Sequence, residues 1–138
     1  MMRSTPQLLV VLVGLAGSVA SAACLHYEGK PVVLSGVLIT RTFYGPPSYG
    51  ETPKGDARET QALLRLDKPI CVENTPGKAN AVYDRADQQK TITLIPNWKS
   101  VKPYLRRRVE VSGLLSGALA GHHHTAVLME VRTIKVTE

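Results

Sequence analysis

The sequence lacks the features by which most enzymes and membrane proteins are recognised. Its longest apolar run, residues 8–16, is too short to span a bilayer. No serine or threonine lies in a nucleophile elbow, and no pair of carboxylates recurs at a catalytic spacing. Cysteine is scarce as well, with two among 138 residues. We therefore expect a protein that is not an enzyme and that has no transmembrane span.

The N-terminus has the pattern of a cleaved secretory signal. A short positive start and the apolar run lead to Ala20-Ser21-Ala22, which has the small-x-small pattern of a signal-peptidase site. We expect residues 1–22 to be removed and residues 23–138 to form one domain in the periplasm or outside the cell. Lipidation of Cys24 is the alternative, although Ser21 stands where lipoprotein signals usually carry Leu.

The two cysteines, Cys24 and Cys71, are expected to form a disulfide. In an oxidising compartment cysteines usually pair, because an exposed free thiol is a liability. The bridge would close a loop of about 47 residues, which stabilises a fold by about 4 kcal/mol in the chain-entropy model. The alternative is two unpaired, buried thiols.

The chain is basic, with a formal charge of +6 at pH 7, and several of its cations lie between Lys99 and Arg108. Outside the cytoplasm, such charge meets anionic envelope polymers, lipid headgroups or acidic proteins rather than nucleic acid. We therefore expect no nucleic-acid partner. The alternative is a basic face that only keeps the protein soluble.

Short stretches rich in β-branched residues indicate an all-β fold. One short helix, Trp98–Leu105 with Asn97 as its N-cap, falls between the third and fourth strands. Long polar or Gly- and Pro-rich loops are predicted at residues 44–59 and 73–90. The five predicted strands are residues 32–40, 60–66 with a continuation at 70–72 beyond Pro69, 91–95, 108–116 and 125–136.

This element order is that of the OB-fold, a five-stranded Greek-key barrel. Gly36 and Gly113 occupy matching places in the first and fourth strands, which are neighbours in that barrel, and they indicate a bend or a close backbone approach. The alternation of apolar and polar residues in the last strand shifts by one position near Arg132-Thr133, which predicts a bulge. We predict a small five-stranded OB-like barrel, with a generic β-barrel or sandwich as the alternative.

Three of the four histidines, His122 to His124, directly precede the last strand. In an OB-like barrel this loop and the loop at residues 44–59 frame the usual ligand surface. The candidate ligand-binding residues are therefore Tyr44, Tyr49, His122, His123 and His124. On an extended backbone His122 and His124 point to one face and His123 to the other.

A metal site is one hypothesis for the histidines. His122 and His124 can supply two ligands to Zn²⁺ or Cu²⁺, and a stable site needs a third. The candidates for that third ligand are Glu51, Asp56, Glu59 and His26. The alternatives are imidazoles that fix the two loops against each other, or imidazoles that gain charge together in mild acid. No other cofactor is expected.

Four segments carry a family resemblance. They are Cys24–Glu28, Gly45-Pro46-Pro47-x-Tyr49, Leu66–Val72 (LDKPICV) and Gly121–Thr125 (GHHHT). Together they resemble the domain-of-unknown-function family 4431, a family of small exported bacterial domains. The resemblance implies export, one β-rich domain and paired cysteines, and it implies no activity.

The expected function is that of an exported, non-catalytic binding or accessory module of the bacterial envelope. Its ligand would be a glycan, a protein or a peptide. The alternative is a periplasmic metal-binding protein that uses His122 and His124. We expect a monomer.

Overall fold

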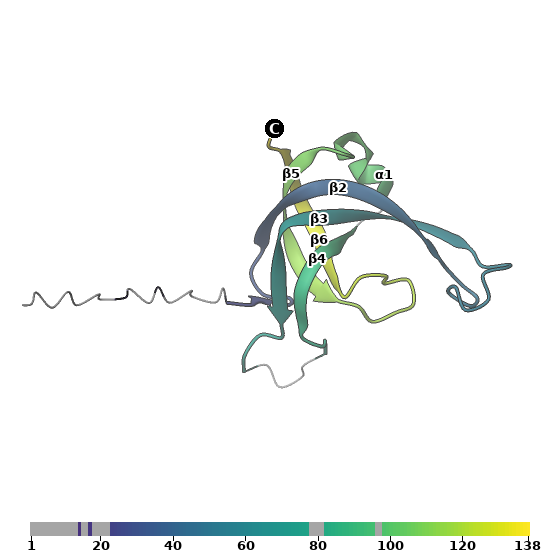
Figure 1. Cartoon of the computed structure of the whole chain (residues 1–138), viewed down its shortest axis with the longest axis horizontal. Coiled ribbons are helices and arrows are strands. Elements are labelled where there is room, and N and C mark those ends of the chain that lie inside the picture. Colours follow the sequence, from purple (N-terminus) through teal and green to yellow (C-terminus); the bar gives the residue numbers. More distant parts are fainter. Residues whose placement is uncertain (1–13, 15–16, 18–22, 78–81, 96–97) are drawn as a thin grey trace, which may run out of the picture.

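A computed structural model describes residues 14, 17, 23–77, 82–95 and 98–138 (Figure 1). The predicted signal sequence, residues 1–22, lies outside these ranges except for two glycines, and the predicted N-cap Asn97 also lies outside them. None of the helices within the described ranges is long and apolar enough to cross a membrane.

The described chain consists of strands and a single short helical segment. The elements in order are β1 (Leu25–His26), β2 (Val32–Tyr44), β3 (Arg58–Glu73), β4 (Ala86–Ile95), α1 (Trp98–Val101), the 3₁₀ turn η1 (Lys102–Tyr104), β5 (Arg108–Gly117) and β6 (Val127–Val136).

Strands β2 to β6 close into a barrel. The sheet order is β3-β2-β5-β6-β4, and β3 also pairs with β4, which closes the ring. Four of these pairings are antiparallel, whereas β4 and β6 are parallel. The helix lies between β4 and β5, the third and fourth barrel strands. The prediction of an OB-like barrel is therefore confirmed.

The barrel interior is filled by aliphatic side chains that alternate with outward-facing residues along the strands. Fully buried members include Leu38, Leu64, Ile92, Val111, Leu115 and Met129. The helical segment closes one end, since Val101 is buried and both Trp98 and Leu105 pack against the core.

Two glycines allow the strands to cross closely, as their matching positions predict. A Cβ atom on Gly36 would overlap the backbone carbonyl of Arg65, and one on Gly113 would overlap that of Glu130. The predicted bulge in β6 is also confirmed. Ser112 pairs with Thr133 but Gly113 pairs with Val131, so the residue between these two β6 partners is the extra one.

Several sequence-based boundaries are wrong. β2 runs to Tyr44 rather than to residue 40, and α1 ends at Val101, with the 3₁₀ turn η1 in place of the predicted helix as far as Leu105. β3 continues through Pro69. Asp67–Pro69 pair with neither β2 nor β4, so the N–H that proline lacks is not needed for a hydrogen bond of the sheet. β4 begins at Ala86 rather than at residue 91, and the polar run 86–90 is part of the strand. Ala86 pairs with Val72, and this long-range pairing leaves no periodic signal in the polar run itself.

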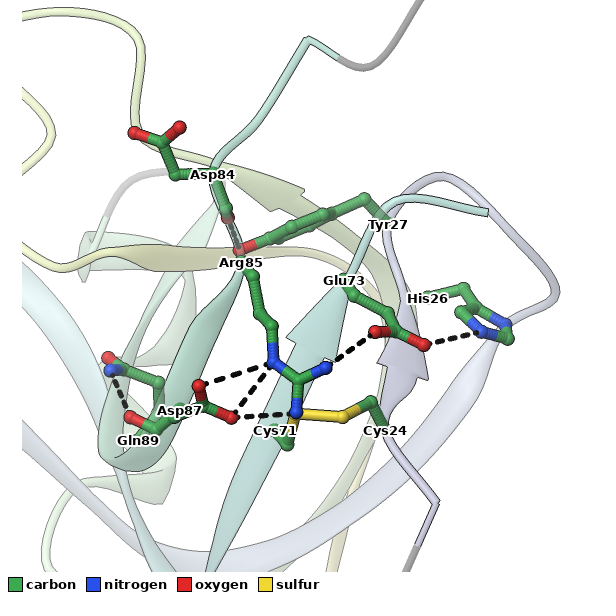
Figure 2. Close-up of a disulfide and its surroundings, with 9 residues drawn as sticks. All are labelled: Cys24, His26, Tyr27, Cys71, Glu73, Asp84, Arg85, Asp87 and Gln89. Carbon is green, nitrogen blue, oxygen red and sulfur yellow. Dashed lines mark hydrogen bonds and ion pairs between the residues drawn. A yellow bond between two sulfur atoms is a disulfide. The ribbon is translucent and has the colours of Figure 1, made fainter. Parts of the chain in front are cut away.

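A disulfide joins Cys24 to Cys71, with the two Cα atoms 4.6 Å apart. The predicted pairing is confirmed, and unpaired thiols are excluded. The bridge ties the start of the described domain to β3, and β1 continues beside it as a short parallel strand. Figure 2 shows the guanidinium of Arg85 beside this bridge, between Glu73 at 3.0 Å and Asp87 at 3.2 Å.

Candidate functional site

The outer halves of β2 and β3 extend beyond the barrel as a curved hairpin, residues 40–62, which we term the arm (Figure 1). Its paired register runs from Thr40↔Ala62 to Tyr44↔Arg58. The β5–β6 loop, residues 118–126, projects from the same side of the barrel. The two predicted loops therefore lie at one end of the molecule.

The turn of the arm is held by one carboxylate. Asp56 accepts hydrogen bonds from the backbone N–H groups of Ser48 and Gly50, each at 2.8 Å, and from the Ser48 hydroxyl. Burial acts to raise the pKa of Asp56, but these donors outweigh it and the pKa lies below its usual range. Asp56, a candidate metal ligand, thus already has a structural task.

A second carboxylate joins the arm to the histidine loop. Glu59, at the start of β3, has one oxygen against Nδ1 of His122 and the other 2.8 Å from Nε2 of His124. Its side chain is 19 % exposed. The hydrogen bond from His124 lowers the pKa of Glu59, burial opposes this, and the hydrogen bond from His122 adds to the lowering. Glu59 is therefore held as a carboxylate that both imidazoles contact.

Aromatic contacts strengthen this junction. Phe43 stacks on the ring of His124, with the centroids 4.3 Å apart and the planes nearly parallel. Tyr49 meets His122 edge-on at 5.8 Å and also covers Gly121 so closely that a Cβ atom there would lie 2.8 Å from the ring. Tyr49 thus contacts the histidine loop, as the sequence predicts.

Tyr44 takes a different place. Its ring lies under the guanidinium carbon of Arg58, 3.9 Å from the ring centroid, and packs within the arm. Gln61 adds a further link between the arm and the histidine loop, because its Nε2 donates to the backbone carbonyl of His122 at 2.6 Å.

A cleft of about 360 Å³ lies between the inner side of the arm, β4, α1 and the histidine loop. We term it the histidine cleft. Of the predicted residues, His122 and His123 line it, whereas His124 packs between Glu59 and Phe43 and is 13 % exposed. The lining residues are Thr60, Gln61, Ala62, Thr93, Leu94, Ile95, Trp98, His122, His123 and Leu128.

The predicted metal ligands do not converge on one point. Within the described ranges, the only three His, Cys, Asp or Glu ligand atoms that lie within 4.8 Å of one another belong to Cys24, Cys71 and Asp87. The two cysteines are closed into the disulfide, with Asp87 3.1 Å from the Cys71 sulfur (Figure 2). His26 also lies beside the disulfide, 3.6 Å from Glu73. Zn²⁺ or Cu²⁺ binding by His122 and His124 stays a prediction.

Three residues of this region were not singled out as site residues from the sequence: Phe43, Gln61 and Trp98. A compositional signal existed for two of them, because the chain has one phenylalanine and one tryptophan and both lie at this end of the barrel. Gln61 offered no such signal, since its role depends on the position of the His122 carbonyl across the cleft.

No curated protein and no solved structure matches the chain. The family described as Domain of unknown function (DUF4431) matches residues 88–135, a span that includes Trp98 and the histidine loop. Over this part of the chain, the resemblance to that family is confirmed.

Proposed function

We propose that this domain is a non-catalytic binding or accessory module of the bacterial envelope, and that its ligand occupies the histidine cleft. The observation that carries the proposal is the cleft itself, on the surface where OB-like barrels usually bind ligands. Its volume lies near the lower end of the range of about 300–1,000 Å³ that is usual for small-ligand sites.

The groups around the cleft favour binding over catalysis. Its ten lining residues include two histidines that could act as acid or base, but no thiol, serine or lysine that could act as nucleophile, and its two threonine hydroxyls are hydrogen-bonded to other threonines. The buried hydroxyl of Thr93 shares a hydrogen bond of 2.7 Å with Thr125, and Glu59 is engaged by two imidazoles. These groups therefore hold the loops in place, which preserves a preformed cleft.

A location outside the cytoplasm belongs to the same proposal. The Cys24–Cys71 disulfide supports it, because such bonds persist mainly in oxidising compartments. Fractionation of cells that express the full chain tests this location. Recovery of a shortened protein in the periplasm or the medium is expected, and retention of the unprocessed chain in the cytoplasm would contradict it.

Capture of partners from envelope extracts tests the binding role. The wild type, a Trp98→Ala variant and a His122→Ala, His123→Ala variant are compared with His26→Ala, which alters a histidine beside the disulfide. We expect a partner that both cleft variants lose and that His26→Ala retains. A partner held equally by all four proteins would remove the cleft from the function.

The second candidate is a metal-binding protein, because Glu59 contacts both His122 and His124 and this His₂Glu set is one that Zn²⁺ uses. A bound ion would require the loop to shift, since the three ligand atoms do not lie close together in the described structure. Calorimetric titration of metal-stripped protein with Zn²⁺ tests this candidate. Equal, weak binding by the wild type and by a His122→Ala, His124→Ala variant would contradict it.

A further inference from the structure

The hydrogen-bonding state of His122 follows from its partner. Nδ1 faces a carboxylate oxygen of Glu59, and an ionised carboxylate only accepts hydrogen bonds. The ring proton of neutral His122 is therefore on Nδ1. Its other nitrogen, Nε2, is left as an acceptor, and the residue lines the cleft.

Neutral His123 carries its ring proton on the other nitrogen. Its Nδ1 lies 2.9 Å from the backbone N–H of Leu119, which can only donate. Nδ1 of His123 therefore carries no proton, and the neutral ring carries its proton on Nε2. Two consecutive residues that both line the cleft thus offer one imidazole acceptor and one imidazole donor.

The remaining walls add an aromatic and an aliphatic surface. The side-chain oxygen of Gln61 is buried and has no hydrogen-bond partner among the described residues, while its nitrogen is held by the His122 carbonyl. Trp98 contributes an indole, and the aliphatic part of the wall comes from residues such as Leu94 and Leu128. A ligand in the cleft therefore meets an apolar surface, a hydrogen-bond donor and a hydrogen-bond acceptor.

Charge narrows the class of ligand. The chain carries +6, yet no Asp, Glu, Lys or Arg is among the ten residues that line the cleft. An anionic or cationic ligand would lose hydration without gaining a charged partner. A purely apolar ligand would leave the imidazole nitrogens desolvated and unpaired. The favoured ligand is uncharged and has groups that both donate and accept.

We infer that the histidine cleft binds a neutral oligosaccharide, an inference that rests on the proposed binding function of this cleft. A pyranose ring has an apolar C–H face, which packs on an indole such as that of Trp98, and hydroxyls that donate and accept at once. A hydroxyl of that ring therefore suits the His122 acceptor and the His123 donor. The volume of the cleft, about 360 Å³, lies within the usual range for small-ligand sites.

The test uses a property of the chain itself, since Trp98 is its only tryptophan. Intrinsic fluorescence is followed while the purified protein is titrated with neutral hexose oligomers, N-acetylhexosamine oligomers, sulfated oligosaccharides and an uncharged peptide library. A saturable change with one of the two neutral sugar classes, and none with the sulfated sugars, is expected.

Calorimetry on variants then places the sugar in the cleft. Trp98→Ala and His122→Phe should each weaken binding by about tenfold or more, because they remove the stacking surface or a hydrogen-bond acceptor. Trp98→Phe should restore much of the affinity. Tyr104→Ala and His26→Phe, which alter an aromatic and a histidine outside the cleft lining, should leave it unchanged. Thermal unfolding of each variant confirms that it is folded.

The possible outcomes separate the two proposals. Binding of the uncharged peptides with the same dependence on Trp98 and His122 would overturn the oligosaccharide but keep the cleft as a binding site. Sugar binding that all variants retain would also overturn the inference. If the envelope extracts yield no partner that depends on the cleft, the proposed binding function fails as well.

Discussion

At the scale of single residues, Glu59 links the arm to the histidine loop. Glu59→Gln keeps its shape but replaces one acceptor oxygen by an NH₂ group, which then faces an imidazole N–H. We expect the free energy of unfolding at pH 7 to fall by about 1–3 kcal/mol. Urea denaturation measures this change. Glu130→Gln, on an exposed position of β6, is the control and should have little effect.

The same carboxylate gives a pH dependence. The hydrogen bond from His124 is the largest cause of the lowered pKa of Glu59. A carboxyl whose pKa is lower in the folded state stabilises the fold above its unfolded value of about 4.3 and loses that contribution as the pH falls through the folded value. The stability difference between wild type and Glu59→Gln should therefore shrink as the pH falls below about 4.3. A difference that is unchanged at pH 3 would contradict this prediction.

A second prediction at the scale of single residues concerns Gly113. Ala at this position would place its Cβ against the backbone carbonyl of Glu130, which cannot rotate away as a side chain can. We expect Gly113→Ala to lower the free energy of unfolding by about 1–3 kcal/mol. Gly29→Ala is the matched control, because the nearest atom to its added Cβ is 3.5 Å away. Equal unfolding midpoints for the two variants would contradict the close approach.

At the scale of elements, the conformation of the arm depends on Asp56, the carboxylate that holds its hairpin turn. Asp56→Ala removes the acceptor for the Ser48 and Gly50 N–H groups but touches no side chain of the barrel core. Amide hydrogen exchange should accelerate about tenfold at these two positions, while core amides keep their rates. Glu51→Ala, in the same turn, is the control. Unchanged exchange at Ser48 and Gly50 would show that the turn is held by other contacts.

The elements that the sequence predicted well are those with local signals. The strand rich in β-branched residues that begins at Val32, the glycine pair and the bulge of β6 were all readable from side-chain type and spacing. The first half of β4 was not, because its extended conformation depends on pairing with a distant part of β3. Local sequence patterns do not indicate such a distant pairing partner.

The candidate site could likewise be predicted from the sequence only in part. Placing the histidine loop beside the Tyr49 loop needed only the strand order of the barrel. The separation of His124 from the cleft could not be foreseen, since it depends on Glu59 and Phe43 reaching the ring from the arm. Similarly, Trp98 joins the cleft because the helical segment packs against the barrel near β3 and β4, which its own sequence does not specify.

At the scale of the whole molecule, the barrel and the disulfide constrain different parts of the chain. β3 pairs with both β2 and β4, so closure of the barrel depends on this strand. The disulfide fastens Cys24 to the far half of β3, where the N-terminal segment also pairs through the two-residue strand β1 and buries Tyr27 in the core. The backbone N–H groups of Tyr27 and Glu28 also donate to the carbonyls of Glu73 and Leu115, so the bridge adds to contacts that already hold this segment.

Loss of the disulfide should therefore destabilise the whole domain while leaving its fold intact. The bridge spans a sequence separation of 47 residues, and its removal should lower the free energy of unfolding by about 2–5 kcal/mol. Urea unfolding of wild type, with and without a dithiol reductant, is compared with a Cys24→Ala, Cys71→Ala variant. Reductant should move the wild type to the midpoint of the variant and should not affect the variant. If the wild type and the variant share one midpoint without reductant, the barrel alone sets the stability and the bridge contributes nothing to it.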